Sequence, residues 1–503
     1  MDEGITMKHL SRYRRHLIAA LLAATLLAAC GEPPQQAPAK PFAGQTIMLI
    51  VPKLHADLIR GPILDEVGPF EKQTGATVRV VTPGWNETIE KIDQSLSDPA
   101  LNYDIFVVLP LWKGTFLHGN HIAPVPEWVK RRIDWEDVLP IYRNHVLTWD
   151  NTAYGLPYDG DCINLYYRRD LFANADYRRR FEAEYGYPLA PPLTWEQYRD
   201  IATFFNGWDW DGDGNTEYGH AGLRLKGDVT LLQFFARAAA YAKHPDHPGY
   251  YFDPQDMTPR INNPGFVRAL EEYVANIAIG PPGMASYAGH DVRNAFAAGE
   301  VAMAIDWADL GIYSVNSPVS VIHDKVGYAQ IPGSERVYNP QSGEWEVRFN
   351  QPSSISGSWM FLVNRDSKYQ ELAFTFAAHM TSPKLTRRLT ATAGNAVNPS
   401  RFSHFDNAEA WEAGGFTTDS ARRYLDTITE SLQNPNVVTD ITIPGAGRYY
   451  RALDDAIGRA VQGELTAQQA LDLAAEEWQA ITDRLGRAEQ ARFYRQTLNL
   501  PAD

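Results

Sequence analysis

The acidic segment 209–217 is where residue types and spacing in this chain point most directly to metal chemistry. Aspartates occupy its first, third and fifth positions and a glycine its sixth, as at the start of an EF-hand calcium loop. Calcium takes six to eight oxygen ligands. The expected ligands are Asp209, Asp211, Asp213, Asn215 and Glu217. His220 stands where such loops carry a glutamate, so Glu217 or a remote acid has to complete the shell. A plain acidic turn is the alternative.

Tryptophans at the ends of expected strands suggest a second kind of chemistry. Trp85 and Trp112 follow the apolar runs 77–81 and 104–109, and Trp307 follows the run 301–305. A sugar presents an apolar face and a ring of hydroxyls, so it needs flat aromatic groups together with carboxylates and amides. Ligands in α/β folds bind beyond the carboxyl ends of parallel strands, which is where these residues fall. Packing on the protein surface is the alternative for each tryptophan.

The elements that would position these residues alternate between strands and helices. Apolar runs at 46–51, 77–81 and 104–109 predict buried strands, and 63–73 and 86–97 show helical spacing between them, with Asn86 as an N-cap. This β-α-β-α-β order predicts an α/β fold with parallel sheets covered on both faces. Further helices are expected after Thr194, at 294–300 and over most of 449–487.

The net charge and the cysteine content argue against several classes of function. The 503 residues carry a formal net charge of −15, which argues against nucleic acid or a bare anionic membrane as partner. The cysteines are Cys30 and Cys162. Cys162 is expected to be a buried small hydrophobe, and no Ser/His/Asp set or phosphate-binding glycine loop stands out. His118 and His121 are too isolated to predict zinc.

The N-terminus reads as an export signal. Basic residues between Lys8 and Arg15 precede a short apolar run that ends in Leu27-Ala28-Ala29-Cys30. This ending resembles the lipobox of bacterial lipoproteins, which implies a lipid on Cys30 and anchoring at the periplasmic or outer face of a membrane. We therefore expect a signal peptide at 1–29, with Met1 or Met7 as the start, and a flexible tether at 30–43.

Several local motifs occur in one order along the chain. They are Leu156-Pro157-Tyr158, Leu165-Tyr166-Tyr167-Arg168-Arg169-Asp170, Pro192-Leu193-Thr194-Trp195-Glu196, Phe296-Ala297-Ala298-Gly299-Glu300, Ser356-Gly357-Ser358-Trp359 and Ala393-Gly394-Asn395-Ala396-Val397-Asn398-Pro399-Ser400-Arg401. Together they resemble the extracellular solute-binding proteins of carbohydrate ABC importers, the family of maltodextrin-binding protein. The resemblance implies a type II periplasmic-binding-protein fold of two doubly wound α/β lobes joined by hinges. Lobe 1 would comprise 44–155 with 356–405, lobe 2 would comprise 156–355 with 406–490, and 491–503 would form a C-terminal tail.

The resemblance also implies a ligand site in the cleft between the lobes. Asp161 matches an acidic ligand residue by position, Trp307 a stacking aromatic and Tyr450 a further aromatic, although the maltodextrin proteins have tryptophan there. The implied ligand-binding set is Trp85, Trp112, Tyr158, Asp159, Asp161, Asp306, Trp307, Ser356, Trp359 and Tyr450. Replacement of Trp307 by alanine is expected to abolish binding with little change in melting temperature.

The expected function is capture of a sugar or polyol and delivery to an ABC permease, by a monomer that is not an enzyme and requires no cofactor beyond a structural calcium. One alternative is a sensory or accessory binding subunit for another solute, including a cationic one. A secreted glycan-active enzyme is a second alternative, because Asp159 and Asp161 alternate along one segment. Such an enzyme needs two carboxylates about 5–10 Å apart across a bound sugar.

Overall fold

The computed structural model describes residues 40–53, 59–98, 101–227, 229–392, 394–395 and 397–501. The predicted signal peptide, the lipidated Cys30, most of the tether, and Ala393 and Ala396 of the last motif lie outside these residues. Within these ranges, no helix is both long enough and apolar enough to cross a membrane.

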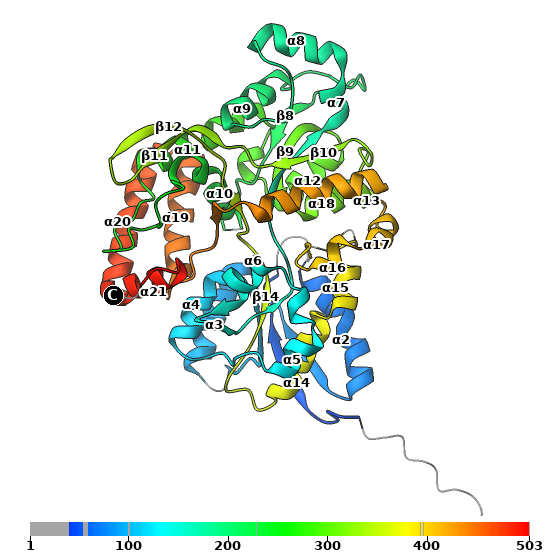
Figure 1. The fold of residues 1–503 in the computed structure, drawn as a ribbon, viewed down its shortest axis with the longest axis vertical. Coiled ribbons are helices and arrows are strands. Elements are labelled where there is room, and N and C mark those ends of the chain that lie inside the picture. The colour runs from blue at the N-terminus through cyan, green and yellow to red at the C-terminus, as the bar shows by residue number, and fades with distance from the viewer. Residues whose placement is uncertain are drawn as a thin grey trace, which may run out of the picture.

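Lobe 1, the lower half of Figure 1, is built on a five-stranded sheet. The strand order is β2 (Thr77–Val81), β1 (Thr46–Ile50), β3 (Ile105–Val108), β14 (Met360–Val363) and β6 (Leu156–Pro157). β1 runs parallel to β2 and β3, which confirms the predicted β-α-β-α-β order, and β14 returns antiparallel between β3 and β6. Every residue of β3 and β14 is buried because helices cover both faces of the sheet.

The helices of lobe 1 are mostly short. They are α2 (Arg60–Thr74), α3 (Trp85–Ser97), η2 (Pro110–Trp112), α4 (Lys113–His118), α5 (Glu127–Arg132), η3 (Trp135–Asp137), α6 (Pro140–Tyr142), η4 (Arg143–Leu147), α14 (Gln370–Met380), α15 (Pro383–Leu389) and α16 (Phe402–Phe405), with a small hairpin of β4 (Thr148–Trp149) and β5 (Thr152–Ala153). The helix expected to start after an Asn86 cap begins two residues earlier, with Gly84 as its N-cap. Trp85 is therefore the first residue of α3, and Trp112 ends η2, so neither lies in an irregular loop.

Lobe 2 is built on a four-stranded mixed sheet. The order is β10 (Val326–Gln330), β7 (Ile163–Arg168), β9 (Val301–Trp307) and β8 (Tyr218–Ala221). β7 is antiparallel to both neighbours, and β8 is parallel to β9. All seven residues of β9 are buried, which explains its small and apolar composition.

The remaining helices belong to lobe 2 (Figure 1). They are α7 (Arg169–Ala173), α8 (Ala175–Tyr185), α9 (Trp195–Phe204), α10 (Thr230–Ala242), α11 (Pro264–Ala275), η5 (Asn276–Ile279), η6 (Met284–Ser286), α12 (Gly289–Ala297), α13 (Asp309–Asn316), α17 (Ala408–Ala413), α18 (Thr418–Gln433), α19 (Ala446–Val461), α20 (Ala467–Leu485) and α21 (Arg487–Thr497). The helix expected at 294–300 is the end of the longer α12, and Thr194 caps α9 as predicted. Residues 491–503, assigned above to a tail, include most of α21.

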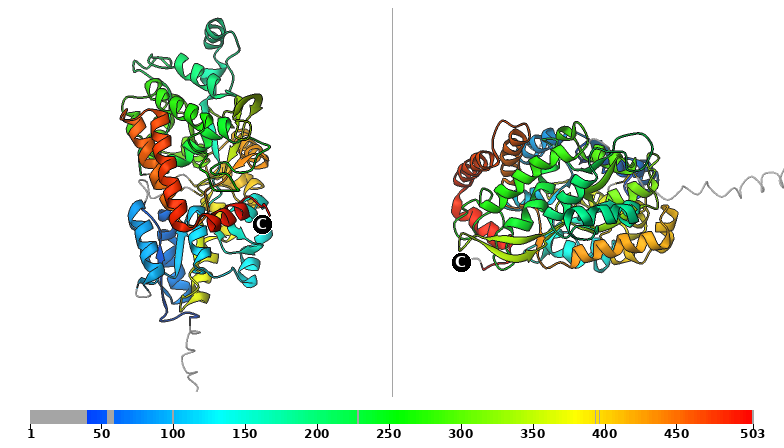
Figure 2. Two further views of the ribbon diagram at one scale, coloured as in Figure 1. Left: turned by 90° about the vertical axis from the view of Figure 1, so that its left-hand side faces the viewer. Right: turned by 90° about the horizontal axis from the view of Figure 1, so that it is seen from above.

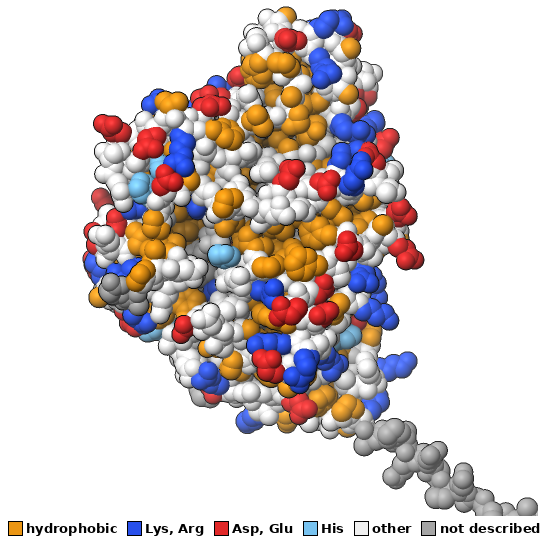
Figure 3. Space-filling model, viewed as in Figure 1, with side chains coloured by type: hydrophobic (Ala, Val, Ile, Leu, Met, Phe, Trp, Pro, Cys, Tyr) orange, Lys and Arg blue, Asp and Glu red, His pale blue; other side chains and the backbone are white. Residues whose placement is uncertain are grey.

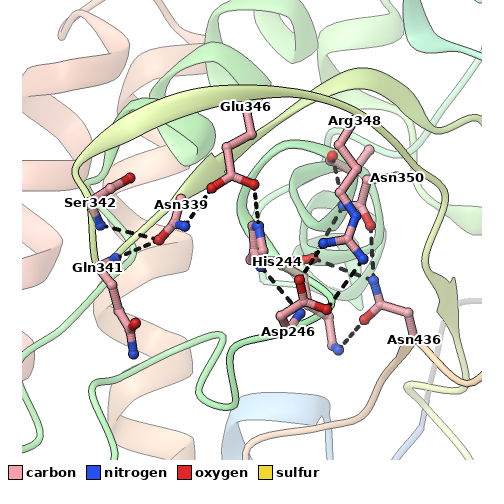
Figure 4. A network of polar contacts seen from close by, with 11 residues as sticks. His244, Asp246, Asn339, Gln341, Ser342, Glu346, Arg348, Asn350 and Asn436 are labelled. Atoms are coloured by element: carbon pink, nitrogen blue, oxygen red, sulfur yellow. Dashed lines mark hydrogen bonds and ion pairs between the residues drawn. The ribbon is translucent and has the colours of Figure 1, made fainter.

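A hairpin of β11 (Ser334–Asn339) and β12 (Glu344–Asn350) ties α10 to the connections between the lobes (Figure 4). His244, just after α10, contacts Glu346 at 3.0 Å. The Asn350 amide donates to the carbonyl oxygens of Ala239 and Ala240 at the end of α10, and it accepts a hydrogen bond from Asn436. Asn350 and Asn436 thus stand directly before β13 (Ser353–Ser354) and β15 (Val437–Val438), which pair in parallel.

Candidate functional site

Three tryptophans of lobe 1 form one aromatic cluster facing lobe 2. Trp85 packs edge-on against Trp112 and Trp359, with ring centroids 5.3 and 6.3 Å apart. Trp112 and Trp359 are buried, whereas Trp85 is only half-buried. Trp85 and Trp112 follow β2 and β3, and Trp359 directly precedes β14, so the structure brings together residues that are distant in sequence.

Trp307 ends β9 in lobe 2, and its side chain is buried. Its indole Nε1 donates a 2.8 Å hydrogen bond to the carbonyl oxygen of Ser356 in the connection that leads to β14. The neighbouring Asp306 is fully buried, and its carboxylate is held at 2.8 Å by the Arg293 guanidinium. Arg293 also pairs with Asp309 at 2.7 Å. Asp306 therefore fixes the end of β9 through an ion pair.

Asp159 and Asp161 lie side by side in the connection between β6 and β7. Asn398 joins them, because its backbone N–H donates to Asp159 Oδ1 and its side-chain amide donates to Asp161 Oδ1, each at 2.6 Å. Burial raises the pKa of both carboxyls, and the pKa of Asp161 is raised further by the charge of Asp159. Among the described residues, the buried Asp159 Oδ2 and Asn398 Oδ1 have no hydrogen-bond partner.

Gly357 lies beside both Trp307 and Asp161. Its φ of 103° belongs to the region that favours glycine, and a Cβ there would stand 3.0 Å from Trp307 Nε1 and 3.1 Å from Asp161 Oδ2. The absence of a side chain lets the indole and the carboxylate approach the connection between β13 and β14. This backbone is also one of the crossings where a hinge must absorb dihedral change.

Asp440 is a site residue that the sequence analysis did not identify. It accepts hydrogen bonds from the backbone N–H of Gly357 at 3.2 Å and from the Tyr450 hydroxyl at 3.1 Å. Burial raises the pKa of Asp440 to about 6 and lowers that of the neighbouring Lys113 to about 8. The sequence offered one signal for Asp440, which is that it is the single acidic residue in the mostly apolar run 437–443.

Two cavities between the lobes flank Tyr450 and Asp440. One of about 190 Å³ is lined by Trp85 and Leu111 of lobe 1 and by Leu232 and Tyr450 of lobe 2, with Lys226, Arg451, Asp454 and Asp455 at its polar side. The other, of about 630 Å³, is lined by Lys113, Trp149 and Asp440 and by residues 496–500 that follow or end α21. The cavity of about 190 Å³ is lined by two of the predicted ligand residues, Trp85 and Tyr450. Hydrophobic side chains gather between the lobes in Figure 3.

Comparison with known proteins agrees with this two-lobed architecture. Residues 67–418 match the family described as bacterial extracellular solute-binding protein. The chain belongs to this family. A mannitol-binding protein of Pseudomonas aeruginosa is 24% identical over 358 residues, which cover 69% of this chain and 72% of that protein. A probable amino-acid ABC transporter periplasmic-binding protein of Sinorhizobium fredii is 23% identical over 353 residues, 68% of this chain and 69% of that protein.

Solved structures of solute-binding proteins share the fold. One from Agrobacterium radiobacter in complex with ribitol aligns with a TM-score of 0.69 at 20% identity and covers 88% of this chain and 100% of its own. One from Agrobacterium vitis with bound D-mannitol aligns with a TM-score of 0.66 at 20% identity, covering 88% and 99%. The predicted type II fold of two α/β lobes is confirmed.

Not every predicted ligand residue of this solute-binding protein faces the cleft. Tyr158 is fully buried in lobe 1, where its hydroxyl donates to the carbonyl oxygen of Ile59 and its ring packs edge-on against Phe361. These contacts commit its side chain to the lobe core. Ser356 contributes its carbonyl oxygen to Trp307, and its side chain is buried.

The acidic segment lies at the end of lobe 2 away from lobe 1, between α9 and β8 (Figure 1). One carboxylate oxygen from each of Asp209, Asp211, Asp213 and Glu217 lies within 4.8 Å of the other three. Asn215 donates through both its backbone and its side-chain nitrogen to Asp213. Burial raises the pKa of Glu217, and its carboxylate also accepts the Trp210 N–H at 2.9 Å. These oxygens match the ligand preference of calcium.

Proposed function

We propose that the protein captures a small polyol or sugar in the interlobe site and delivers it to an ABC permease. The observation that carries this is the set of buried, unpaired acceptors, Asp159 Oδ2 and Asn398 Oδ1, close to the tryptophans. A buried acceptor without a partner costs about 1–3 kcal/mol, which a ligand hydroxyl would recover. Hydroxyls beside indole faces are the chemistry of polyhydroxy solutes.

Cavity size favours a short ligand. The cavity at Trp85 and Tyr450 holds about 190 Å³, below the range of about 300–1,000 Å³ typical of sites for drug-sized molecules. An acyclic polyol or a monosaccharide suits this volume better than an oligosaccharide. Ribitol and D-mannitol, bound in the two solved relatives, are solutes of this size class.

The site supports binding and not hydrolysis. Asp159 and Asp161 are joined by the same Asn398 side chain and backbone, so they lie together on one side of the site. A glycosidase needs its carboxylates on the two sides of a scissile bond, about 5–10 Å apart. The pair is better suited to form hydrogen bonds with two hydroxyls of one ligand.

Ligand capture works by closure of the lobes. Trp85, Trp112 and Trp359 belong to lobe 1, whereas Trp307 and Tyr450 belong to lobe 2. A ligand that touches both sets binds the closed state more strongly than the open state, and it shifts the population accordingly. We further propose that a lipid on Cys30 holds the protein beside its permease, at the periplasmic or cell-surface face of the membrane.

Calorimetric titration of residues 42–503 with ribitol, mannitol, glucose, maltose and putrescine tests the proposal. We expect micromolar or tighter binding of one polyol or monosaccharide. Asp161→Asn should lower the affinity about 2-fold to 10-fold, because a hydrogen bond between neutral groups contributes about 0.5–1.5 kcal/mol. Asp426→Asn, at an exposed position of α18, is the matched control. If putrescine binds and none of the other four solutes does, the ligand belongs to a cationic class and not to the polyols.

A further inference from the structure

A small cavity lies inside lobe 2, behind the strand that carries Trp307. Its volume is about 30 Å³, and it is lined by Trp195 of α9, Arg224 after β8, Arg237 of α10 and Ile305 of β9. A cavity of this volume has room for about one or two water-sized particles. It is separate from the interlobe site, which begins two residues further along β9 at Trp307.

Arg224 brings an uncompensated charge to this cavity. Its side chain is buried, and its guanidinium donates to the carbonyl oxygens of Leu223 at 2.6 Å and Tyr273 at 3.0 Å. Its Cζ lies 3.5 Å from the centroid of the Tyr273 ring. No carboxylate of the described chain forms an ion pair with Arg224, and burial lowers its pKa.

Arg237 adds a second buried guanidinium group, and Glu272 balances its charge. It pairs with Glu272 at 2.7 Å, but the same carboxylate also accepts from Arg268 at 3.1 Å and from the Tyr241 hydroxyl at 2.6 Å. Arg237 also lies over the Trp195 ring, with Cζ 4.1 Å from its centroid. Arg268 also pairs with Glu196, so Glu272 and Glu196 together balance Arg237 and Arg268. The charge at this cavity that has no carboxylate is therefore that of Arg224.

Three buried donors that line the cavity lack acceptors. They are Arg224 Nε, Arg237 Nε and Trp195 Nε1, and none has a hydrogen-bond partner among the described residues. Two water molecules could accept from all three donors, but water brings no charge and would leave the buried Arg224 without a counter-ion. His220, which also lines the cavity, donates from Nε2 to Asn276 O at 2.8 Å, and burial lowers its pKa to about 3, so it adds no negative charge.

We propose that this cavity binds a dehydrated monovalent anion of halide size, chloride in the native environment, between Arg224, Arg237 and Trp195. The small volume of the cavity favours a halide over the larger sulfate or phosphate. The anion would stabilise the floor of the ligand site, because Gln233, another lining residue, donates to the carbonyl oxygen of Ile305 at 3.0 Å. This inference does not depend on which solute the cleft binds.

Bromide substitution in crystals of the wild-type protein tests the site directly. We expect an anomalous peak in contact with Arg224 Nε, Arg237 Nε and Trp195 Nε1 in bromide, and none in gluconate at equal ionic strength. A cavity that is empty or holds only water in bromide would overturn the proposal.

Melting temperature measured against chloride, bromide and gluconate at constant ionic strength tests the site in solution. We expect a saturable rise of several degrees with either halide that is absent in Trp195→Phe, which keeps the ring but loses the N–H donor. Trp208→Phe loses an indole N–H that donates to Phe204 O outside this cavity, so it should keep the halide response. A halide peak in crystals without any halide-specific rise in solution would show binding at crystal concentration only and would contradict a native site. If Trp195→Phe fails to fold, the wild-type diffraction and melting data still decide.

Discussion

Trp307 Nε1 and the carbonyl oxygen of Ser356, 2.8 Å apart, join the last residue of the central lobe-2 strand to the connection between the lobes. Gly357 follows directly, and its backbone N–H is held by Asp440. The Trp307 indole, the connection between the lobes and the buried Asp440 carboxylate are thus joined by consecutive hydrogen bonds. We expect a change in any of them to alter how the lobes close.

Mutation of Trp307 can test the contribution of its hydrogen bond separately from that of its aromatic ring. Trp307→Phe keeps an aromatic ring but removes the bond to Ser356, so we expect affinity to fall about 5-fold to 30-fold, for a loss of about 1–2 kcal/mol. Calorimetry with the solute identified for the wild type measures this change. Unchanged affinity would show that the indole N–H has no part in closure.

Trp307→Ala should also lower the melting temperature. The sequence alone predicted little change, but Trp307 is only 4% exposed, and truncation of a buried tryptophan typically costs about 3–5 kcal/mol. Thermal unfolding without ligand measures the effect. A melting temperature equal to that of the wild type would mean that the ligand-free protein opens and exposes this ring.

Stability without ligand should fall as pH rises, because of Asp159 and Asp161. Burial raises the folded-state pKa of both above the ordinary aspartate value of about 3.9. Their stabilising contribution is therefore complete below about pH 4 and is lost as pH rises through the raised values, by roughly 1.4 kcal/mol per pH unit for each extra proton bound in the folded state. Melting temperatures between pH 4 and 8 should show this slope, and Asp161→Asn should flatten it. Parallel curves for the two proteins would contradict the assignment.

The C-terminal helix α21 lies across the junction of the lobes (Figure 2, left). Phe493 packs against the rings of His118 and Trp149 in lobe 1, with centroids 5.4 and 6.1 Å away. The adjacent Tyr494 hydroxyl accepts the Tyr251 N–H of lobe 2 at 3.1 Å. α21 therefore links the lobes at a point outside the two central connections.

Phe493→Ala should favour the open state. Removal of this 5% exposed ring deletes the packing on lobe 1 and leaves Tyr494 on lobe 2. We expect a larger radius of gyration in small-angle scattering without ligand and weaker solute binding. Phe402→Ala, at a side chain that is 50% exposed, provides the control. Identical scattering from Phe493→Ala and wild type would show that α21 does not restrain opening.

Local patterns predicted the strands well but not the contacts between distant segments. The continuous apolar runs of β1 and β3 and the position of Trp307 at the end of β9 follow from residue order alone. Asp440 meets Gly357 across 83 positions of sequence, and Asn398 meets Asp159 across 239, so no periodicity reveals either contact. Tyr158 is next to Asp159 in sequence, yet its side chain lies in the core of lobe 1. Closeness in sequence therefore did not place it in the site.

Calcium should stabilise lobe 2 through the acidic segment. Asp209, Asp211, Asp213 and Glu217 place carboxylate oxygens within 4.8 Å of one another, so their mutual repulsion is relieved when a cation binds. We expect millimolar or lower calcium to raise the melting temperature, magnesium to have a smaller effect because it demands a tighter octahedral shell, and chelation to reverse the rise.

Asp213→Asn tests this assignment with little change in shape. It keeps an oxygen that can accept the Asn215 N–H, at 2.8 Å in the wild type, but it removes one charge from the cluster. We expect at least a tenfold loss in calcium affinity by isothermal titration, with polyol affinity unchanged because the segment lies at the far end of lobe 2 from the cleft (Figure 1). Asp426→Asn should retain calcium binding. Equal responses of wild type and Asp213→Asn, or none in either, would leave the segment as an acidic turn that binds no metal.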